Sequence, residues 1–153
     1  MRLPRMVVLL LLVGTFPARP QVTGRGLKVV VLDALNGKPQ ANVKVESFCV
    51  GPPGNERGQT AFTNDEGIAI VSYTCSANQA IEFEVFPPSK KEQCGDDVKT
   101  NLADVTSRGF ISNPSAAGGI WCPTKVGRTL KPVPGQVTVF VKKPTWWQSH
   151  VVG

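Results

Sequence analysis

Few side chains in this sequence could act as a nucleophile, a general base or a general acid. The chain has one histidine, His150, near its C-terminus, where a side chain is seldom held firmly enough to position a proton. The sequence contains neither an H-E-x-x-H nor a G-x-S-x-G motif. Glu82 and Glu84 could act as a glycosidase pair, but a solvated strand face explains their spacing better. We therefore predict that the protein is not an enzyme and has no catalytic residue and no cofactor.

Oxygen-bearing side chains gather in one short stretch and could bind calcium, which prefers several hard oxygen ligands. They are Asp96, Asp97, Asn101 and Asp104. Their spacing matches neither an EF-hand nor a D-x-D-x-D-G loop. A solvated acidic loop is the better interpretation, and we predict no metal site.

The cysteines are the strongest chemical signal in the chain, and they predict two disulfides. They are Cys49, Cys75, Cys94 and Cys122. An even number in an exported chain favours a disulfide framework, and the absence of any C-x-x-C pair disfavours a zinc site. Three pairings are open. The pairing Cys49–Cys75 with Cys94–Cys122 is favoured, because the first two each end a predicted strand and the other two bracket a segment without periodicity.

Trp146 and Trp147 are the candidate binding residues. Adjacent residues of an extended chain point to opposite sides, so at most one of these rings can enter a core. An exposed aromatic ring commonly marks a surface that binds sugars or proteins. A structural alternative stays open, in which one ring caps the edge of the fold and the other packs in a groove. The third tryptophan, Trp121, is next to Cys122 and is expected to pack on a disulfide.

The N-terminus has the three parts of an export signal. Arg2 and Arg5 precede the apolar run 6–13, and small or helix-breaking residues follow it. A membrane anchor is the alternative, but a spanning helix needs about 20 apolar residues and this run is much shorter. We therefore predict that residues 1–20 are a cleaved signal peptide. The mature chain is then secreted, periplasmic or attached to the cell surface, and has no membrane span.

The charge of the mature chain does not favour nucleic acid as a partner. The whole chain has 17 basic and 11 acidic side chains, and removing residues 1–20 removes three arginines and no acid, which leaves a net charge of +3. No block of basic residues occurs, and the densest spots are the dipeptides Lys90-Lys91 and Lys142-Lys143. A solvated, slightly basic surface is the better interpretation.

Strands must position these side chains, because alternation of apolar and polar residues dominates the chain from Leu27 onward. The predicted strands are 27–33, 41–46, 60–63, 68–73, 81–85 and 136–142, with a further short strand at 109–111. The residues predicted to be buried are Val29, Val31, Val43, Val45, Ile68, Ile70, Ile81, Phe83, Val85, Val137 and Val139.

Turn residues set the connections between these strands. Asn36–Pro39 joins the first two runs into a hairpin-like pair, and Asn64–Gly67 forms a second tight turn. The segment 88–135 has little periodicity, apart from a short helical turn predicted within 96–106. Such a long segment needs a fastener in a compact domain, and a disulfide could supply it.

The chain of 153 residues predicts one domain, spanning 25–150. Short strands separated by turns predict an all-β fold: an antiparallel immunoglobulin-like or prealbumin-like sandwich of about seven strands, with a long irregular segment near 88–135.

The stretch from Leu27 to Val85 resembles the carboxypeptidase regulatory-like domains. The resemblance rests on an apolar strand followed by Asn36–Pro39, on the stretch 60–70 with its Thr-x-Thr-x-x-x-Gly-like turn, and on the alternating strand 81–85. A Gly-Tyr step often found before the last of these strands is missing, and Asn78-Gln79-Ala80 stands there instead. The resemblance implies a prealbumin-like (transthyretin-like) sandwich and a non-catalytic module of exported or cell-surface proteins.

These observations predict a non-catalytic exported module that interacts with a protein or a component of the cell envelope. The alternative is a carbohydrate-binding module that uses an exposed tryptophan, Trp146 or Trp147, as a stacking platform. A polysaccharide is therefore a candidate partner, whereas nucleic acid is not.

Overall fold

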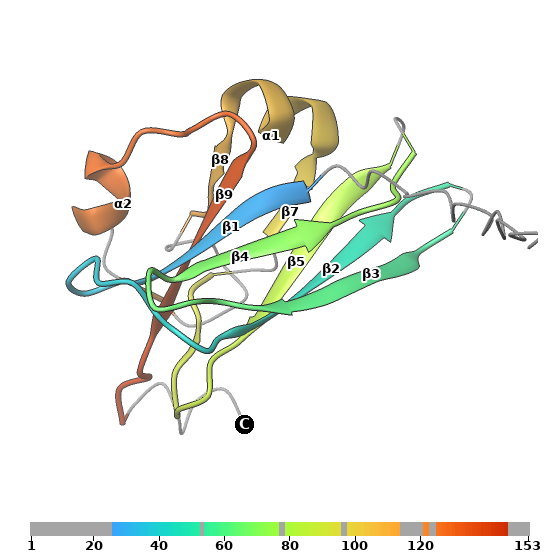
Figure 1. Cartoon of the computed structure of the whole chain (residues 1–153). Coiled ribbons are helices and arrows are strands. Elements are labelled where there is room, and N and C mark those ends of the chain that lie inside the picture. Colours follow the sequence, from blue (N-terminus) through green and yellow to red (C-terminus); the bar gives the residue numbers. More distant parts are fainter. Residues whose placement is uncertain are drawn as a thin grey trace, which may run out of the picture.

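The fold consists of two β-sheets packed face to face, as predicted (Figure 1). A computed structural model describes residues 26–52, 54–76, 79–95, 98–113, 121–122 and 125–146. The first sheet contains β4 (Ile68–Ser72), β1 (Gly26–Asp33), β9 (Gln136–Lys142) and β6 (Glu92–Gln93) in that order, with β8 (Phe110–Ile111) also paired to β9. The second contains β3 (Glu56–Phe62), β2 (Lys44–Val50), β5 (Ala80–Phe86) and β7 (Val98–Asn101). The predicted signal peptide, residues 1–20, lies outside the described residues.

The predicted hairpin between the first two strands is wrong. β1 pairs with β4 and β9, whereas β2 pairs with β3 and β5, so the turn at Asn36–Pro39 carries the chain from one sheet to the other. β1 and β2 each have an apolar face, and because the chain crosses between the sheets, these two faces meet in a shared core. The sandwich is also not wholly antiparallel, because β9 runs parallel to both β1 and β8.

The core confirms the predicted alternation in every run except β4. Nine of the predicted core residues are buried, but Ile68 is half-buried and Ile70 is 62% exposed. Ala69 and Val71 fill the core instead. β4 is apolar on both faces, so its sequence does not show which face is inward. The pairing of Ala69 with the buried Val29 of β1 decides the orientation.

β9 is buried on both faces, because the segment 88–135 covers the outside of the first sheet. Val137, Val139 and Val141 point into the main core, as predicted. Phe140 points the other way, into a second apolar cluster with Ala34, Cys94 and Cys122, and with the half-buried Leu32, Ile111 and Val126. The irregular segment therefore has a structural role: it shields an apolar strip that would otherwise face water.

The same segment contains more regular structure than its sequence predicts. Residues 98–101 form β7, so the predicted helical turn begins only at α1 (Leu102–Arg108). The Asn101 side chain caps this helix by accepting a hydrogen bond from the Ala103 N–H at 2.8 Å. The short strand predicted at 109–111 is present as β8, and a second short helix, α2 (Lys125–Thr129), was not predicted.

Both predicted disulfides are present. The Cα atoms are 5.2 Å apart in Cys49–Cys75 and 5.7 Å apart in Cys94–Cys122. Two disulfides indicate an oxidising environment outside the cytoplasm. No helix among the described residues is long and apolar enough to cross a membrane.

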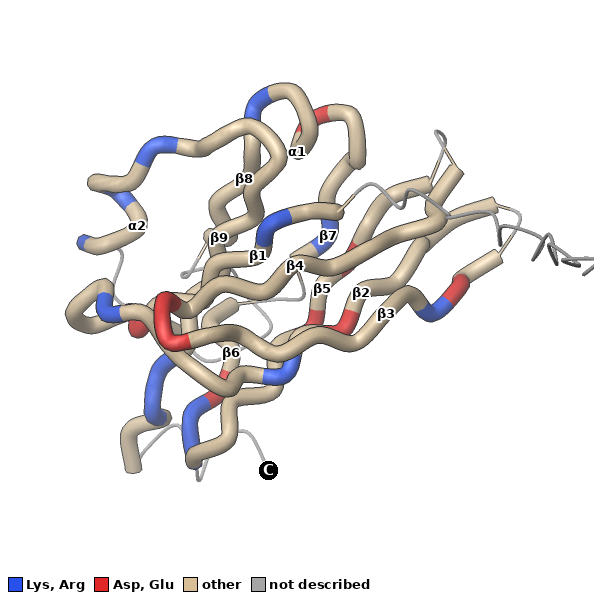
Figure 2. Tube along the Cα trace, in the orientation of Figure 1, with Lys and Arg blue, Asp and Glu red and all other residues tan. Residues whose placement is uncertain are grey.

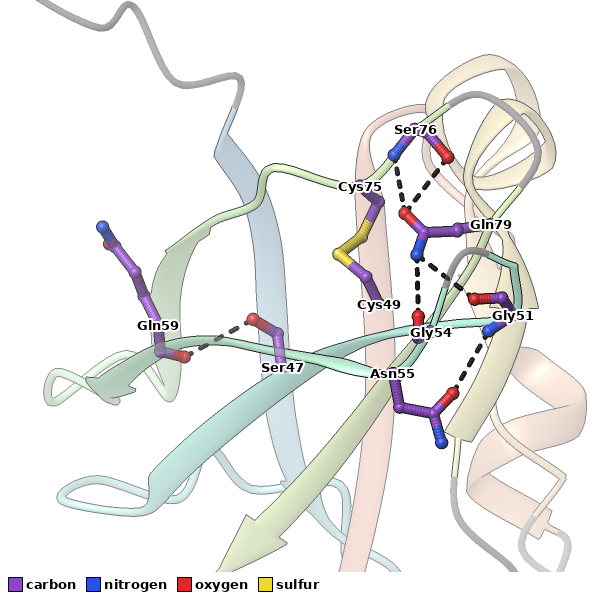
Figure 3. Close-up of a disulfide and its surroundings, with 9 residues drawn as sticks. All are labelled: Ser47, Cys49, Gly51, Gly54, Asn55, Gln59, Cys75, Ser76 and Gln79. Carbon is purple, nitrogen blue, oxygen red and sulfur yellow. Dashed lines mark hydrogen bonds between the residues drawn. A yellow bond between two sulfur atoms is a disulfide. The ribbon is translucent and has the colours of Figure 1, made fainter.

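Gln79 ties together two loops beside the Cys49–Cys75 disulfide (Figure 3). Its side chain is almost completely buried. The amide oxygen accepts hydrogen bonds from the backbone N–H of Ser76 at 2.9 Å and from the hydroxyl of Ser76 at 3.1 Å. The amide nitrogen donates to the carbonyls of Gly51 at 3.4 Å and Gly54 at 3.0 Å. Gln79 thus anchors this end of the sandwich.

The substitution Gln79→Glu is expected to destabilise the domain by about 2–3 kcal/mol. Glutamate has the same shape, but it puts an oxygen in place of the donor that faces two carbonyl oxygens. Asn55→Asp is the matched control, because the Asn55 side-chain oxygen only accepts, from the Gly51 N–H at 3.2 Å. The control should change stability by no more than about 0.5 kcal/mol. Urea unfolding followed by circular dichroism measures both, and equal losses would contradict the role of the Gln79 donor.

Candidate binding surface at one end of the sandwich

The two lysine dipeptides, far apart in sequence, meet at one end of the fold. β6 pairs antiparallel with the end of β9, with Glu92 opposite Lys142. Lys90-Lys91 therefore lies beside Lys142-Lys143, as the neighbouring blue stretches before β6 and after β9 show in Figure 2. We call this surface the lysine end and define it as Lys90, Lys91, Lys142, Lys143 and Trp146.

The four lysines of this surface differ in their surroundings. The Lys91 ammonium lies 2.8 Å from Asp33 Oδ2 and donates to Gln40 Oε1 at 2.6 Å. Lys142 is buried. Lys90 and Lys143 are exposed, and neither has a hydrogen bond or ion pair within the part of the chain that the structure describes. Two of the charges are thus held in the fold, and two face solvent.

Asp33 is ionised in the folded protein. Burial of its carboxylate, 9% exposed, opposes ionisation, but the hydrogen bonds from Lys91 and from the Leu35 N–H (2.9 Å) outweigh this effect. The pKa of Asp33 therefore lies below its ordinary value. This pair fastens the start of β6 to the end of β1, and so holds the lysine end against the first sheet.

The Asp33–Lys91 pair is expected to stabilise the domain at neutral pH and to lose this effect in acid. Because the folded-state pKa is depressed, the stabilisation is complete above the unfolded pKa, near 3.9, and is lost as the pH falls through the folded pKa. Lys91→Met should cost about 1–3 kcal/mol at pH 7 and should remove this part of the acid dependence. Urea midpoints at pH 7 and pH 3 test this, with the exposed Lys90→Met as the control. A loss for Lys91→Met that is the same at both pH values would contradict it.

Two exposed aromatic residues are close in sequence to these lysines. Trp146 follows β9 and is 63% exposed, so this candidate residue is on the surface. Phe86 ends β5, just before the loop that leads to Lys90, and its ring centroid is 4.2 Å from Lys44 Nζ. The Val85 N–H donates to Gln93 Oε1 at 3.0 Å, which joins β5 to β6. An exposed indole therefore follows the exposed Lys143 by three residues.

Of the other two tryptophans, the structure describes Trp121 and not Trp147. Trp147 lies outside the described residues. Trp121 is 61% exposed, and its packing on the disulfide stays a prediction. Its neighbour Cys122 is fully buried. The disulfide is thus covered from within, by the second apolar cluster.

The outer face of the second sheet is a network of charges without the geometry of an acid–base site. Glu82 and Glu84 are half-exposed on this face, as predicted. Glu46 lies 2.5 Å from Arg57 and 3.1 Å from Lys44. The hydrogen bond from Arg57, then that from Lys44, lowers the pKa of Glu46 below its ordinary value. This carboxylate therefore stays ionised and is unsuited to donate a proton near neutral pH.

The described residues of the acidic stretch that could bind calcium form a helix cap and an ion pair instead. Asn101 caps α1, and Asp104 pairs with Arg108 one turn later. Asp96, Asp97 and His150 lie outside the described residues. Among the residues that are described, no three His, Cys, Asp or Glu side chains gather closely enough to hold a metal ion.

Both lysine dipeptides are evident in the sequence, but the sequence does not predict that they lie side by side. The missing information is the pairing of β6, a strand of only two residues, with β9. So short a strand has no detectable alternation.

Comparisons with protein-family models, with curated proteins and with solved structures find no match to this chain.

Proposed function

We propose that this chain is an exported, non-catalytic β-sandwich module that binds a component of the cell envelope through the lysine end. The observation that carries the proposal is the exposed Trp146, three residues after the exposed Lys143. Tryptophan is enriched at surfaces that bind partners, because its ring is apolar and its N–H can donate a hydrogen bond. The disulfides support export, because such bonds persist outside the cytoplasm.

The resemblance to carboxypeptidase regulatory-like domains is part of this proposal. Its pieces fall in order on β1, on the turn into β2, on the β3–β4 corner and on β5. These are the strands that supply most of the main core. A module of this kind supplies a rigid scaffold, and its function depends on the surface that it carries.

A carbohydrate ligand is the second candidate, and Trp146 favours it. Indole rings stack on the apolar faces of sugar rings, and an exposed ring at the end of a strand is well placed for this contact.

Tryptophan fluorescence tests whether the lysine end binds envelope material. We expect purified cell-wall fragments to change the emission of the wild-type protein and of Trp121→Phe, but not that of Trp146→Phe. The Trp121 variant is the matched control, because the two rings are almost equally exposed. A change that persists in Trp146→Phe would place the site elsewhere. The absence of any change, together with no cosedimentation with the fragments, would reject the proposed function.

A further inference from the structure

We propose that two copies of this chain join into a dimer through the open edge of β3. The surface consists of Thr60, Ala61 and Phe62, and we call it the β3 edge. This inference goes beyond the proposed function and concerns a different part of the molecule. β3 lies against β4, whereas the lysine end lies beside β6, at the opposite edge of the first sheet.

The β3 edge has backbone groups that its own sheet does not use. β3 is the last strand of its sheet, and among the described strands only β2 is paired with it (Figure 1). The Thr63 N–H donates to the Val43 carbonyl at 3.0 Å, so Thr63 and, two residues earlier, Ala61 direct their backbone groups toward β2. The N–H and C=O groups of Thr60 and Phe62 alternate with these and point away from the sheet. Both residues are exposed, so these groups are open to another strand.

The same segment lacks the features that commonly prevent a strand edge from pairing. Such features are charged residues, proline and β-bulges. β3 does have a bulge, where its register against β2 shifts between Glu46 and Phe48, but the extra residue lies before Thr60. The three residues of the β3 edge carry no charge, and Phe62 is 60% exposed. The second half of β3 is therefore an unprotected edge that ends in an exposed aromatic ring.

The other free edges of the two sheets are less suited to pairing. In β4, the Ile68 N–H donates to Asn64 Oδ1 and the Ile68 carbonyl accepts from the Asn64 N–H, both at 2.9 Å, so the turn already uses these outward groups. β7 has four residues, and one of them is the exposed Lys99. β6 and β8 have two residues each. Strand pairing between molecules is thus favoured at β3.

A second copy fits the β3 edge in one antiparallel register. Only one register gives both outward residues of each copy a partner: Thr60 of each copy pairs with Phe62 of the other, and Ala61 faces Ala61 across a twofold axis. Each Thr60–Phe62 pair then exchanges two N–H···O bonds, and two four-stranded sheets become one continuous sheet. On the outer face, each Phe62 ring lies beside Thr60 of the other copy, which is a favourable cross-strand contact.

The charges on either side of the β3 edge are complementary in this register. Arg57 lies four residues before Ala61, and Asp65 lies four residues after it. Antiparallel pairing about Ala61 therefore brings Arg57 of each copy to the Asp65-Glu66 turn of the other, at both ends of the shared ladder. The Arg57 side chain is 67% exposed although it bonds to Glu46, and both acids of the turn are exposed. A parallel pairing would bring like charges together, so the charges favour a twofold dimer.

Sedimentation equilibrium of the whole mature protein tests the inference. We expect a reversible dimer with a dissociation constant on the order of 10–100 μM, because the shared ladder is short and the interface is small. Phe62→Lys puts a charge on the edge and should weaken dimerisation by about tenfold or more. Ile70→Lys is the matched control, because Ile70 is 62% exposed on the edge strand of the other sheet.

The Ile70→Lys control should change the dissociation constant by less than about twofold. A wild-type protein that stays monomeric up to about 1 mM would overturn the inference. Equal losses in the two lysine variants would also overturn it, because they would show association through exposed apolar residues in general.

Disulfide trapping tests the register. In the proposed dimer the two Ala61 Cα atoms are about 4.5 Å apart, within reach of a disulfide, whereas the two Thr60 Cα atoms are diagonal neighbours about 7–8 Å apart. Mild oxidation should therefore join Ala61→Cys into a covalent dimer much faster than Thr60→Cys. Peptide mapping without reduction identifies the new bond and checks that both native disulfides persist. Equal trapping of the two variants, or a dimer in solution that Ala61→Cys does not trap, would overturn the pairing through the β3 edge.

Discussion

Replacing Gly109 with alanine is expected to destabilise the domain by about 4 kcal/mol or more, a large share of the 5–15 kcal/mol typical of a domain. A Cβ atom at this position would lie 2.0 Å from the Val133 carbonyl oxygen and 2.5 Å from its carbonyl carbon. These are backbone atoms, so they cannot turn away as a side chain can. The backbone angles of Gly109, φ 78° and ψ 171°, also lie in a region that is open almost only to glycine.

This crowding arises where α1 and the approach to β9 cross. The N–H groups of Gly109 and of Gly135 both donate to the Val105 carbonyl, at 2.9 Å each. Gly135→Ala is the matched control, because Gly135 also has a positive φ, 73°, but nothing lies within 4 Å of its Cβ position. It should cost only about 1–2 kcal/mol. Urea unfolding followed by circular dichroism compares the variants, and a Gly109→Ala protein as stable as Gly135→Ala would contradict the close approach.

Removing the Cys94–Cys122 disulfide, by Cys94→Ala/Cys122→Ala, is expected to cost roughly 3–4 kcal/mol and to open one side of the fold first. The bond closes a loop of sequence separation 28, and the chain-entropy model gives this magnitude for such a loop. The bond also belongs to the second apolar cluster, with Phe140 and Ala34. Without it, the cover over the outer face of β9 depends on a few apolar contacts.

Hydrogen exchange distinguishes this local opening from general destabilisation. In Cys94→Ala/Cys122→Ala, exchange should rise first in β6, β8 and α2, while β2 and β5 stay protected. Cys49→Ala/Cys75→Ala is the control, because its loop, with a separation of 26, has nearly the same chain entropy, whereas Cys49 belongs to β2 of the second sheet. It should instead expose β2 and the loops around Gln79. An identical exchange pattern in the two variants would contradict the separate roles of the disulfides.

The strands and their inward faces could be predicted wherever apolar and polar residues alternate. β5 and β1 show this best, because Ile81, Phe83, Val29 and Val31 are buried as their spacing predicts. In an alternating strand only the apolar face is suited to burial, so the pattern itself predicts which face points into the core. The cysteines could also be paired, because two ended strands and two bracketed a segment without periodicity.

Other features were decided only by tertiary structure. β4 is apolar on both faces, and its contact with β1, not its own pattern, turned Ala69 inward and left Ile70 exposed. For β9, burial could be predicted for one face only. The residues that cover Phe140 on the other face belong to a segment without alternation, so the sequence does not show this contact.

By itself the sequence determined the all-β class, the buried residues of most strands, the disulfides and Trp146 as a candidate residue. The sheet order, the parallel pairing of β1 with β9 and the pairing that brings Lys90-Lys91 beside Lys142-Lys143 were decided only by the tertiary structure. The physical reason is the range of the interactions. The alternation of apolar and polar residues depends only on which face of a strand is buried, and this can be recognised from neighbouring residues. A two-residue strand such as β6 has no such pattern, and its position depends on a partner strand far along the chain.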